Sequence, residues 1–172
     1  KHILKRLSGE PVIPRDANSI FIDLIKNKTS KEDLEQTLQQ KFIQGIKLDG
    51  RLAVSDTLNA SDLLFTGIIQ RFLTENLTYD SIGRVDKKRI KITLVVSLKD
   101  IKNKKNIIDN ELIQSYYTFS EISPPVISEY FALDSILQQL SDRLVKKIVT
   151  GWYTELMSKM EKGSRKKKTQ HE

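Results

Sequence analysis

The sequence predicts an α+β fold, a two-layer sandwich in which a mostly antiparallel sheet is covered on one face by two helices. Three long segments with strand-like patterning follow one another closely between residues 62 and 119. An amphipathic helical segment lies on each side of this block, and each has a single apolar stripe. The predicted order is therefore β-α-β-β-β-β-α, and the long consecutive strands are expected to form a meander.

The first strand and the first helix are predicted within residues 19–46. Ser19 to Ile25 is short, apolar and rich in residues that favour strands. Ser30, with Asp33 three residues later, resembles a capping box and predicts that a helix begins there. The apolar residues that follow fall on one helical face: Leu34, Leu38, Phe42, Ile43 and Ile46.

A block of extended segments follows the Asp49-Gly50 turn. Arg51 to Ser55 predicts a short strand, and Asp62 to Tyr79 predicts a long one. Arg71 and Glu75 interrupt the alternation of the long strand, so we expect a bulge or a twist there. One face of it should carry Leu63, Phe65, Gly67, Ile69, Leu73 and Leu77.

The cleanest alternation in the chain lies between Arg89 and Lys99. Its aliphatic residues point one way: Ile90, Ile92, Leu94, Val96 and Leu98. Such a period of two predicts a half-buried antiparallel strand. The preceding turn ends at Gly83, which can adopt positive φ, and Ile107 to Phe119 predicts the third long strand.

A long helix is expected to begin at Ser128 and to continue to about residue 159. Its apolar stripe repeats at three- to four-residue spacing: Leu133, Leu137, Leu140, Leu144, Ile148 and Trp152. The predicted organisation is an irregular N-terminal tether over residues 1–17, a single α+β domain over 18–160, and a basic flexible tail over 161–172.

Composition excludes several classes of protein. With 172 residues the chain fits one domain, and it has no apolar run of the roughly 18 residues that a membrane span needs. It has no cysteine, which removes disulfides and thiolate chemistry. If the natural chain carries a lipid on an N-terminal cysteine, that residue precedes Lys1.

The residues that catalysis needs are scarce. His2 and His171 lie near the two termini, and the acidic residues are scattered among basic ones. No metal-ligand, phosphate-loop or nucleophile motif is present in the sequence. We therefore expect a binding protein with no enzymatic activity, no metal and no cofactor.

Positive charge is concentrated in one part of the chain. Arg84 to Lys105 holds nine basic residues against Asp86 and Asp100. Five of the nine cluster at the start of a strand and form the candidate site for phosphates: Arg84, Lys87, Lys88, Arg89 and Lys91. The alternative is a solvated hairpin. Nucleic acid is not the expected partner, because no aromatic residue lies between Tyr79 and Tyr116, but a nucleic-acid-binding module stays open as an alternative.

An ordered series of short motifs resembles the LptE-like lipopolysaccharide-assembly lipoprotein family. The series covers about residues 19 to 155: an apolar strand ending in Asn27-Lys28-Thr29, then Leu34-Glu35, Gly50-Arg51-Leu52, Ser61-Asp62 with Phe65, Gly67 and Ile69, Tyr79-Asp80, and Gly83-Arg84-Val85. Ser61 departs from the family's usual alanine, and Asn76 stands where a proline often lies.

The resemblance implies a lipoprotein on the periplasmic side of the outer membrane, attached by a lipid on a cysteine that this chain does not contain. It implies a non-catalytic subunit that plugs and helps to assemble the LptD β-barrel. It also implies lipopolysaccharide binding, which we carry onto the five basic residues by their position in the hairpin. A different envelope accessory lipoprotein, such as a cell-wall synthase activator or a secretion-channel component, is the alternative.

Overall fold

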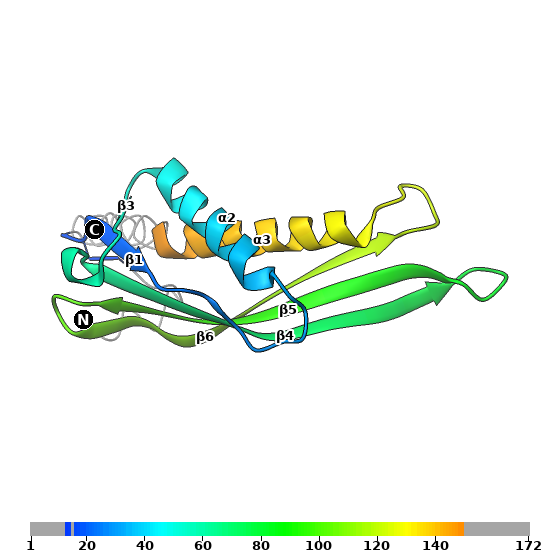
Figure 1. Cartoon of the computed structure of the whole chain (residues 1–172), viewed down its shortest axis with the longest axis horizontal. Helices are drawn as coiled ribbons and strands as arrows, with labels where there is room; N and C mark the ends of the chain where they lie inside the picture. The colour runs from blue at the N-terminus through cyan, green and yellow to red at the C-terminus, as the bar shows by residue number, and fades with distance from the viewer. Residues whose placement is uncertain (1–12, 15, 150–172) are drawn as a thin grey trace, which may run out of the picture.

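The protein folds into a long sheet with two helices packed on one face, as the computed structural model shows for residues 13–14 and 16–149 (Figure 1). The sheet has six strands in the order β3-β1-β4-β5-β6, and β2 pairs with β4 beside this path. The strands are β1 (Ser19–Ile22), β2 (Lys26–Asn27), β3 (Ala53–Val54), β4 (Leu63–Tyr79), β5 (Val85–Asp100) and β6 (Lys105–Ser120). The predicted α+β class is confirmed.

The three long strands form the expected antiparallel meander. β4 pairs with β5 and β5 with β6 along nearly their whole lengths. The three short strands instead run parallel to their neighbours, since β1 pairs with both β3 and β4, and β2 pairs with β4. The sheet is therefore mixed, with its antiparallel part supplying almost all of its length.

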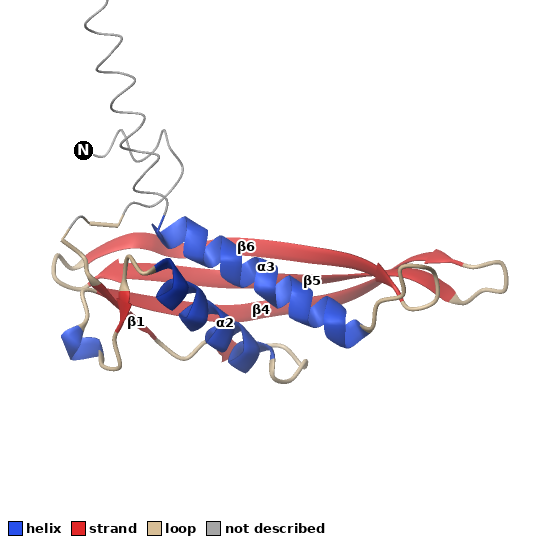
Figure 2. Cartoon of the chain, turned by 90° about the horizontal axis from the view of Figure 1, so that it is seen from above, coloured by secondary structure: helices blue, strands red, loops and turns tan. Residues whose placement is uncertain are grey.

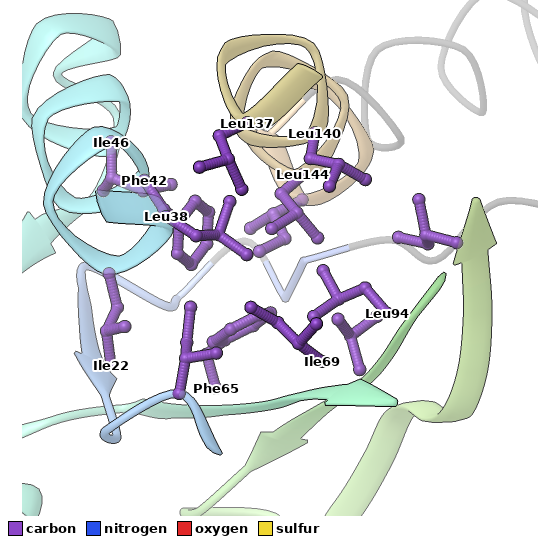
Figure 3. Close-up of a cluster of buried hydrophobic side chains, with 14 of the residues drawn as sticks. Ile22, Leu38, Phe42, Ile46, Phe65, Ile69, Leu94, Leu137, Leu140 and Leu144 are labelled. Carbon is purple, nitrogen blue, oxygen red and sulfur yellow. The ribbon is translucent and has the colours of Figure 1, made fainter. Parts of the chain in front are cut away.

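Helices α2 (Leu34–Asp49) and α3 (Glu129–Val149) cover one face of the sheet (Figures 1 and 2). Their apolar stripes meet the inward side chains of the strands in one continuous core. Figure 3 shows this contact, with Phe42 of α2 above Phe65 of β4. The two rings lie 4.6 Å apart between centroids, in a tilted arrangement that is typical of buried aromatic pairs.

The alternation predicted for β5 is confirmed, because the five aliphatic residues of its predicted inward face, Ile90, Ile92, Leu94, Val96 and Leu98, are all buried. A bulge predicted in β4 is also present, as a register shift between Ile69 and Arg71. The prediction that Leu73 and Leu77 share the inward face is wrong, since both are about 40% exposed (41% and 40%). The extra residue at the bulge turns Phe72 inward and Leu73 outward, because side chains alternate with a period of two.

The start of α2 differs from the prediction. Ser30 does not cap the helix, which begins at Leu34 after Asp33 in the left-handed region at φ 64°, with no side-chain cap. Residues 27–31 form a separate turn, in which Thr29 and Asn27 take the local hydrogen bonds. For α3 the predicted start holds, since the Phe131 N–H donates to Ser128 Oγ.

The first predicted strand, Ser19 to Ile25, is divided in two. β1 ends at Ile22, and the chain leaves the ladder before β2 begins at Lys26. The side chain of Gln39 in α2 accepts the Ile25 N–H at 2.8 Å, which replaces the missing ladder bond. Of the predicted tether, Ile13 is buried in the core; residues 1–12, the end of the last helix and the basic tail lie outside the described residues.

Candidate functional site

The site predicted from the sequence lies on the hairpin of β4 and β5, which extends past the helices at one end of the molecule (Figure 2). Two more register shifts, between Asn76 and Thr78 and between Thr78 and Tyr79, disturb the pairing there. The connection from β6 to α3 lies at the base of this extension, where Ser120 Oγ donates to Asp86 Oδ1 at 2.9 Å. We call this end of the molecule the tip, defined by residues 76–91 and 121–128.

A hydrogen-bonded turn shapes the end of the hairpin. Asp80 Oδ1 accepts the backbone N–H groups of Ile82 at 3.0 Å and Arg84 at 2.8 Å. Gly83 adopts φ 83°, in the left-handed region that glycine tolerates. Removal from water opposes ionisation of Asp80, but the guanidinium and the backbone N–H of Arg84 outweigh that effect and lower the pKa of the Asp80 carboxyl.

The five predicted site residues do not share one surface. Ile90 and Ile92, which alternate with these cations along β5, point into the core. Lys87, Arg89 and Lys91 therefore lie on the face opposite the helices. Lys88 has the parity of the core residues and therefore lies on the helix side of the hairpin. Arg84 lies at the end of the turn. The fold thus brings three of the five together and separates the other two.

Three of these cations are paired with acids. Arg84 Nε lies 2.7 Å from Asp80 Oδ2, Lys88 Nζ 2.6 Å from Glu121 Oε2, and Arg89 Nε 2.8 Å from Glu75 Oε2. These pairs leave Lys87 and Lys91 as the site cations without an ion pair to any described residue.

The fold reduces the local charge that the sequence suggested. The three acids of these ion pairs and Asp86, whose carboxyl accepts the Ser120 hydroxyl, make four carboxylates near the site. With the five cations, the site has a net charge of +1. The partners Glu75 and Glu121 come from neighbouring strand and loop positions outside the basic stretch, so their contribution depends on strand register.

Aromatic and aliphatic side chains accompany the cations on the face opposite the helices. Leu73 and Tyr116 flank Lys91 on the two neighbouring strands, and both are exposed. The Arg89 guanidinium lies 5.8 Å from the centroid of the Tyr116 ring, within the range of a cation–π contact. The sequence did not predict that Leu73 and Tyr116 lie beside the site, because no local pattern shows which residues on three strands are neighbours.

The remaining basic residues of the stretch lie at the opposite end of β5. Lys99 is the next-to-last residue of β5, Lys102 and Lys104 belong to the turn that joins β5 to β6, and Lys105 begins β6. Lys102 Nζ contacts Asp16 Oδ2 at 3.2 Å. Lys91 and Lys99 are eight residues apart on β5, so about 26 Å of strand separates the two basic groups at their nearest points.

A groove of about 520 Å³ lies between the first turns of α2 and α3. It presents three acids, Glu32, Asp33 and Asp134, while its lysine, Lys31, is paired with Glu129 at 3.1 Å. This balance does not suit an anionic ligand. Within residues 13–14 and 16–149, no group of three His, Cys, Asp or Glu side chains is arranged to hold a metal ion.

Solved structures share this fold at low sequence identity. An uncharacterized lipoprotein B from Nitrosomonas europaea matches with a TM-score of 0.61 at 10% identity, over 83% of this chain and 88% of that one. A protein from Xanthomonas campestris matches at 0.55 and 13% identity, over 89% and 95%. PelC from Paraburkholderia phytofirmans, solved as a dodecamer, matches at 0.50 and 12% identity, over 81% and 93%.

The fold is therefore shared with a bacterial protein that is described as a lipoprotein. The chain belongs to the LptE family, whose model, described as lipopolysaccharide-assembly, matches residues 17–150. This family consists of non-catalytic accessory lipoproteins of the cell envelope. No sequence among the curated proteins matches the chain. Among the described residues, neither helix has the length and apolar character of a membrane span.

Proposed function

We propose that this protein is the non-catalytic outer-membrane lipoprotein subunit that plugs and helps to assemble an LptD-like β-barrel, and that it binds lipopolysaccharide through the tip. The observation that carries the binding role is the alternating row of Lys87, Arg89 and Lys91 on the face of β5 opposite the helices. In this proposal Arg84 and Lys88 add charge from the turn and from the helix side.

The chemistry of the row suits a phosphorylated ligand. Lys87 and Lys91 act as point charges that form no ion pair with a described residue, although the charge of Lys87 also acts on Asp86, while Arg89 is held by Glu75 and Tyr116. A phosphate would accept hydrogen bonds from the two lysines without breaking an existing ion pair. Exposed positions also make this attraction sensitive to salt.

The face of the sheet opposite the helices supports the role of barrel plug. Hydrogen-bonding side chains alternate along it, among them Thr66, Ser97 and Gln114, and Gln114 donates to the nearly buried Thr93 at 3.3 Å. The interior of a membrane barrel is lined mainly by polar side chains. This face also carries apolar side chains, among them Ile68, Val95 and Leu112, so it is the polar positions between them that we propose to meet such a wall.

The ligand-binding proposal is tested with the double variant Lys87→Glu and Lys91→Glu. Lipopolysaccharide binding should weaken by about tenfold or more, because two phosphate contacts become repulsive. The matched control is Lys99→Glu with Lys104→Glu, which makes the same change of charge at the far end of the sheet and should leave binding unchanged. Equal effects of the two variants would reject the site assignment.

The partner is tested by purifying the tagged protein from envelope extracts. We expect a large outer-membrane β-barrel to be recovered with it in a fixed ratio. Recovery of a cell-wall synthase or of a secretion channel in place of the barrel would favour the alternative role as another accessory lipoprotein.

A further inference from the structure

The tip carries a group of apolar side chains that the core does not use. Tyr79 and Ile82, at the end of the hairpin, are 60% and 73% exposed. Leu77 is 40% exposed at a register shift, and Val126, in the connection to α3, is 63% exposed. Single exposed apolar residues are common on protein surfaces, but a group at the end of a projecting hairpin indicates a contact surface.

The fold holds Ile82 outward. The Asp80 carboxylate accepts the N–H of Ile82 itself, and the backbone closes the turn with bonds from Gly83 N to Asp80 O at 3.1 Å and from Asp80 N to Arg84 O at 2.8 Å. These bonds fix the backbone of the turn on both sides of Ile82, and the side chain is exposed in this conformation. Its exposure follows from the structure of the turn and not from a loose loop.

The charges around this apolar group are arranged for an anionic neighbour. Glu75, Asp80 and Glu121 are engaged by Arg89, Arg84 and Lys88, and Asp86 accepts the hydroxyl of Ser120. Hydrogen bonds from Ser123 and Ser120 lower the pKa of Asp86, and the bond from Lys88 lowers that of Glu121. The nearby carboxylates are thus satisfied internally, while the Lys87 ammonium forms no ion pair with a described residue and acts on Asp86 only through its charge.

We infer that the tip binds at the boundary between the anionic head groups and the acyl chains of a lipid, with Ile82 and Tyr79 among the acyl chains and Lys87 at the phosphates. A surface with apolar residues beside cations is the combination that inserts into an anionic lipid layer. This inference rests on the proposed binding of lipopolysaccharide and deepens it, since it assigns protein residues to the acyl part of the ligand.

The test compares two ligands that carry the same phosphates: intact lipopolysaccharide and its fully deacylated, water-soluble form. Ile82→Ser should weaken binding of the intact ligand by about tenfold, because a largely buried isoleucine contact is lost. It should leave binding of the deacylated ligand unchanged. The matched control is Leu48→Ser, which removes an apolar side chain that is 80% exposed in the last turn of α2 and should change neither.

The possible results separate this inference from the function on which it rests. If Ile82→Ser binds intact lipopolysaccharide like the wild type, or weakens both ligands equally, the acyl contact is rejected. If Ile82→Ser instead lowers only the recovery of the barrel, the tip binds protein and the inference is again rejected. The proposed lipopolysaccharide binding itself fails if the wild-type protein binds neither ligand, and the proposed phosphate site fails if Lys87→Glu with Lys91→Glu affects neither.

A fluorescence measurement tests the same contact without loss of binding. The single tryptophan, Trp152, is replaced by phenylalanine, and Ile82→Trp then provides the only indole. Its emission should shift to shorter wavelength with intact lipopolysaccharide and stay constant with the deacylated form. Leu48→Trp in the same background should not respond. Absence of a shift at position 82 would overturn the inference.

Discussion

At the scale of single residues, the side chain of Asn27 makes four local hydrogen bonds. Its Oδ1 accepts hydrogen bonds from both the N–H and the hydroxyl of Thr29, at 2.9 and 2.8 Å. Its Nδ2 donates to the Lys31 carbonyl at 2.7 Å and to Glu35 Oε2 at 2.9 Å. One amide thus joins the end of β2 to the first turn of α2, which explains why the Asn-x-Thr turn precedes this helix.

Replacing Asn27 tests that explanation. Asn27→Ala should lower the free energy of unfolding by about 2 kcal/mol, because several part-buried hydrogen bonds are lost. Asn27→Asp should be at least as harmful, since a carboxylate cannot donate to the Lys31 carbonyl and would repel Glu35. Urea denaturation measures both, with the exposed neighbour Lys28→Ala as a near-neutral control. Wild-type stability of Asn27→Asp would contradict the account.

At the scale of elements, the contact between the two helices depends on a residue without a side chain. A Cβ atom at Gly45 of α2 would lie 2.7 Å from Cγ2 of Val145 in α3. The crossing is therefore closest at this point, and the valine cannot turn away easily because β-branched side chains have one preferred rotamer in helices.

This geometry predicts that Gly45→Ala changes the free energy of unfolding in opposite directions in the wild type and in a Val145→Ala background. In the wild type, Gly45→Ala should lower the free energy of unfolding by about 1 kcal/mol, because overpacking outweighs the gain in helix propensity. In a Val145→Ala background the same change should raise that free energy by about 1 kcal/mol. Thermal and urea unfolding measure both, and effects of the same sign would show that the two residues are not in contact.

The edge strand β6 has features that hinder its pairing with strands of other molecules. An exposed edge of 16 residues offers unpaired backbone groups to other strands. Here the Arg143 guanidinium of α3 donates to the Gln114 carbonyl, and Asn110, at φ 45°, accompanies a register shift between Val96 and Leu98. Both features make the edge a poorer template for pairing.

Local patterns predicted the elements better than they predicted the contacts between them. The alternation from Ile90 to Leu98 determined the buried face of β5 because each residue follows the same rule. One extra residue near Arg71 reversed the face of Leu73, and no local pattern shows such an insertion precisely enough. Likewise, the pairing of Arg89 with Glu75 depends on the register of two strands, so the charge of the site could not be predicted from the basic stretch alone.

At the scale of the whole molecule, carboxylates stabilise both ends of the sheet. Asp62 at the start of β4 accepts the N–H groups of Asn18 and Ser19, and chiefly the bond from Asn18 lowers its pKa. At the tip, Asp80, Asp86 and Glu121 also have lowered pKa values. Charged carboxylates thus hold β1 to β4 at one end and the hairpin to the β6–α3 connection at the other.

These shifts predict loss of stability in acid. Because each folded pKa lies below the unfolded value, the stabilisation is complete above about pH 5 and is lost as the pH falls through the folded values. Urea midpoints should therefore be level near neutral pH and decrease below about pH 4. Asp62→Asn should begin from a lower midpoint and decrease less steeply. A midpoint that is constant or rises toward pH 3 would contradict the prediction.

The part of the hairpin that projects beyond the helices has a further consequence. Its strands contribute little to the core there, so their length can change without repacking the helices. Removing two residues from each strand would keep every remaining side chain on its own face and draw the tip back by about 7 Å. The distance from the helices to the tip can thus be changed, by evolution or by design, separately from the stability of the fold.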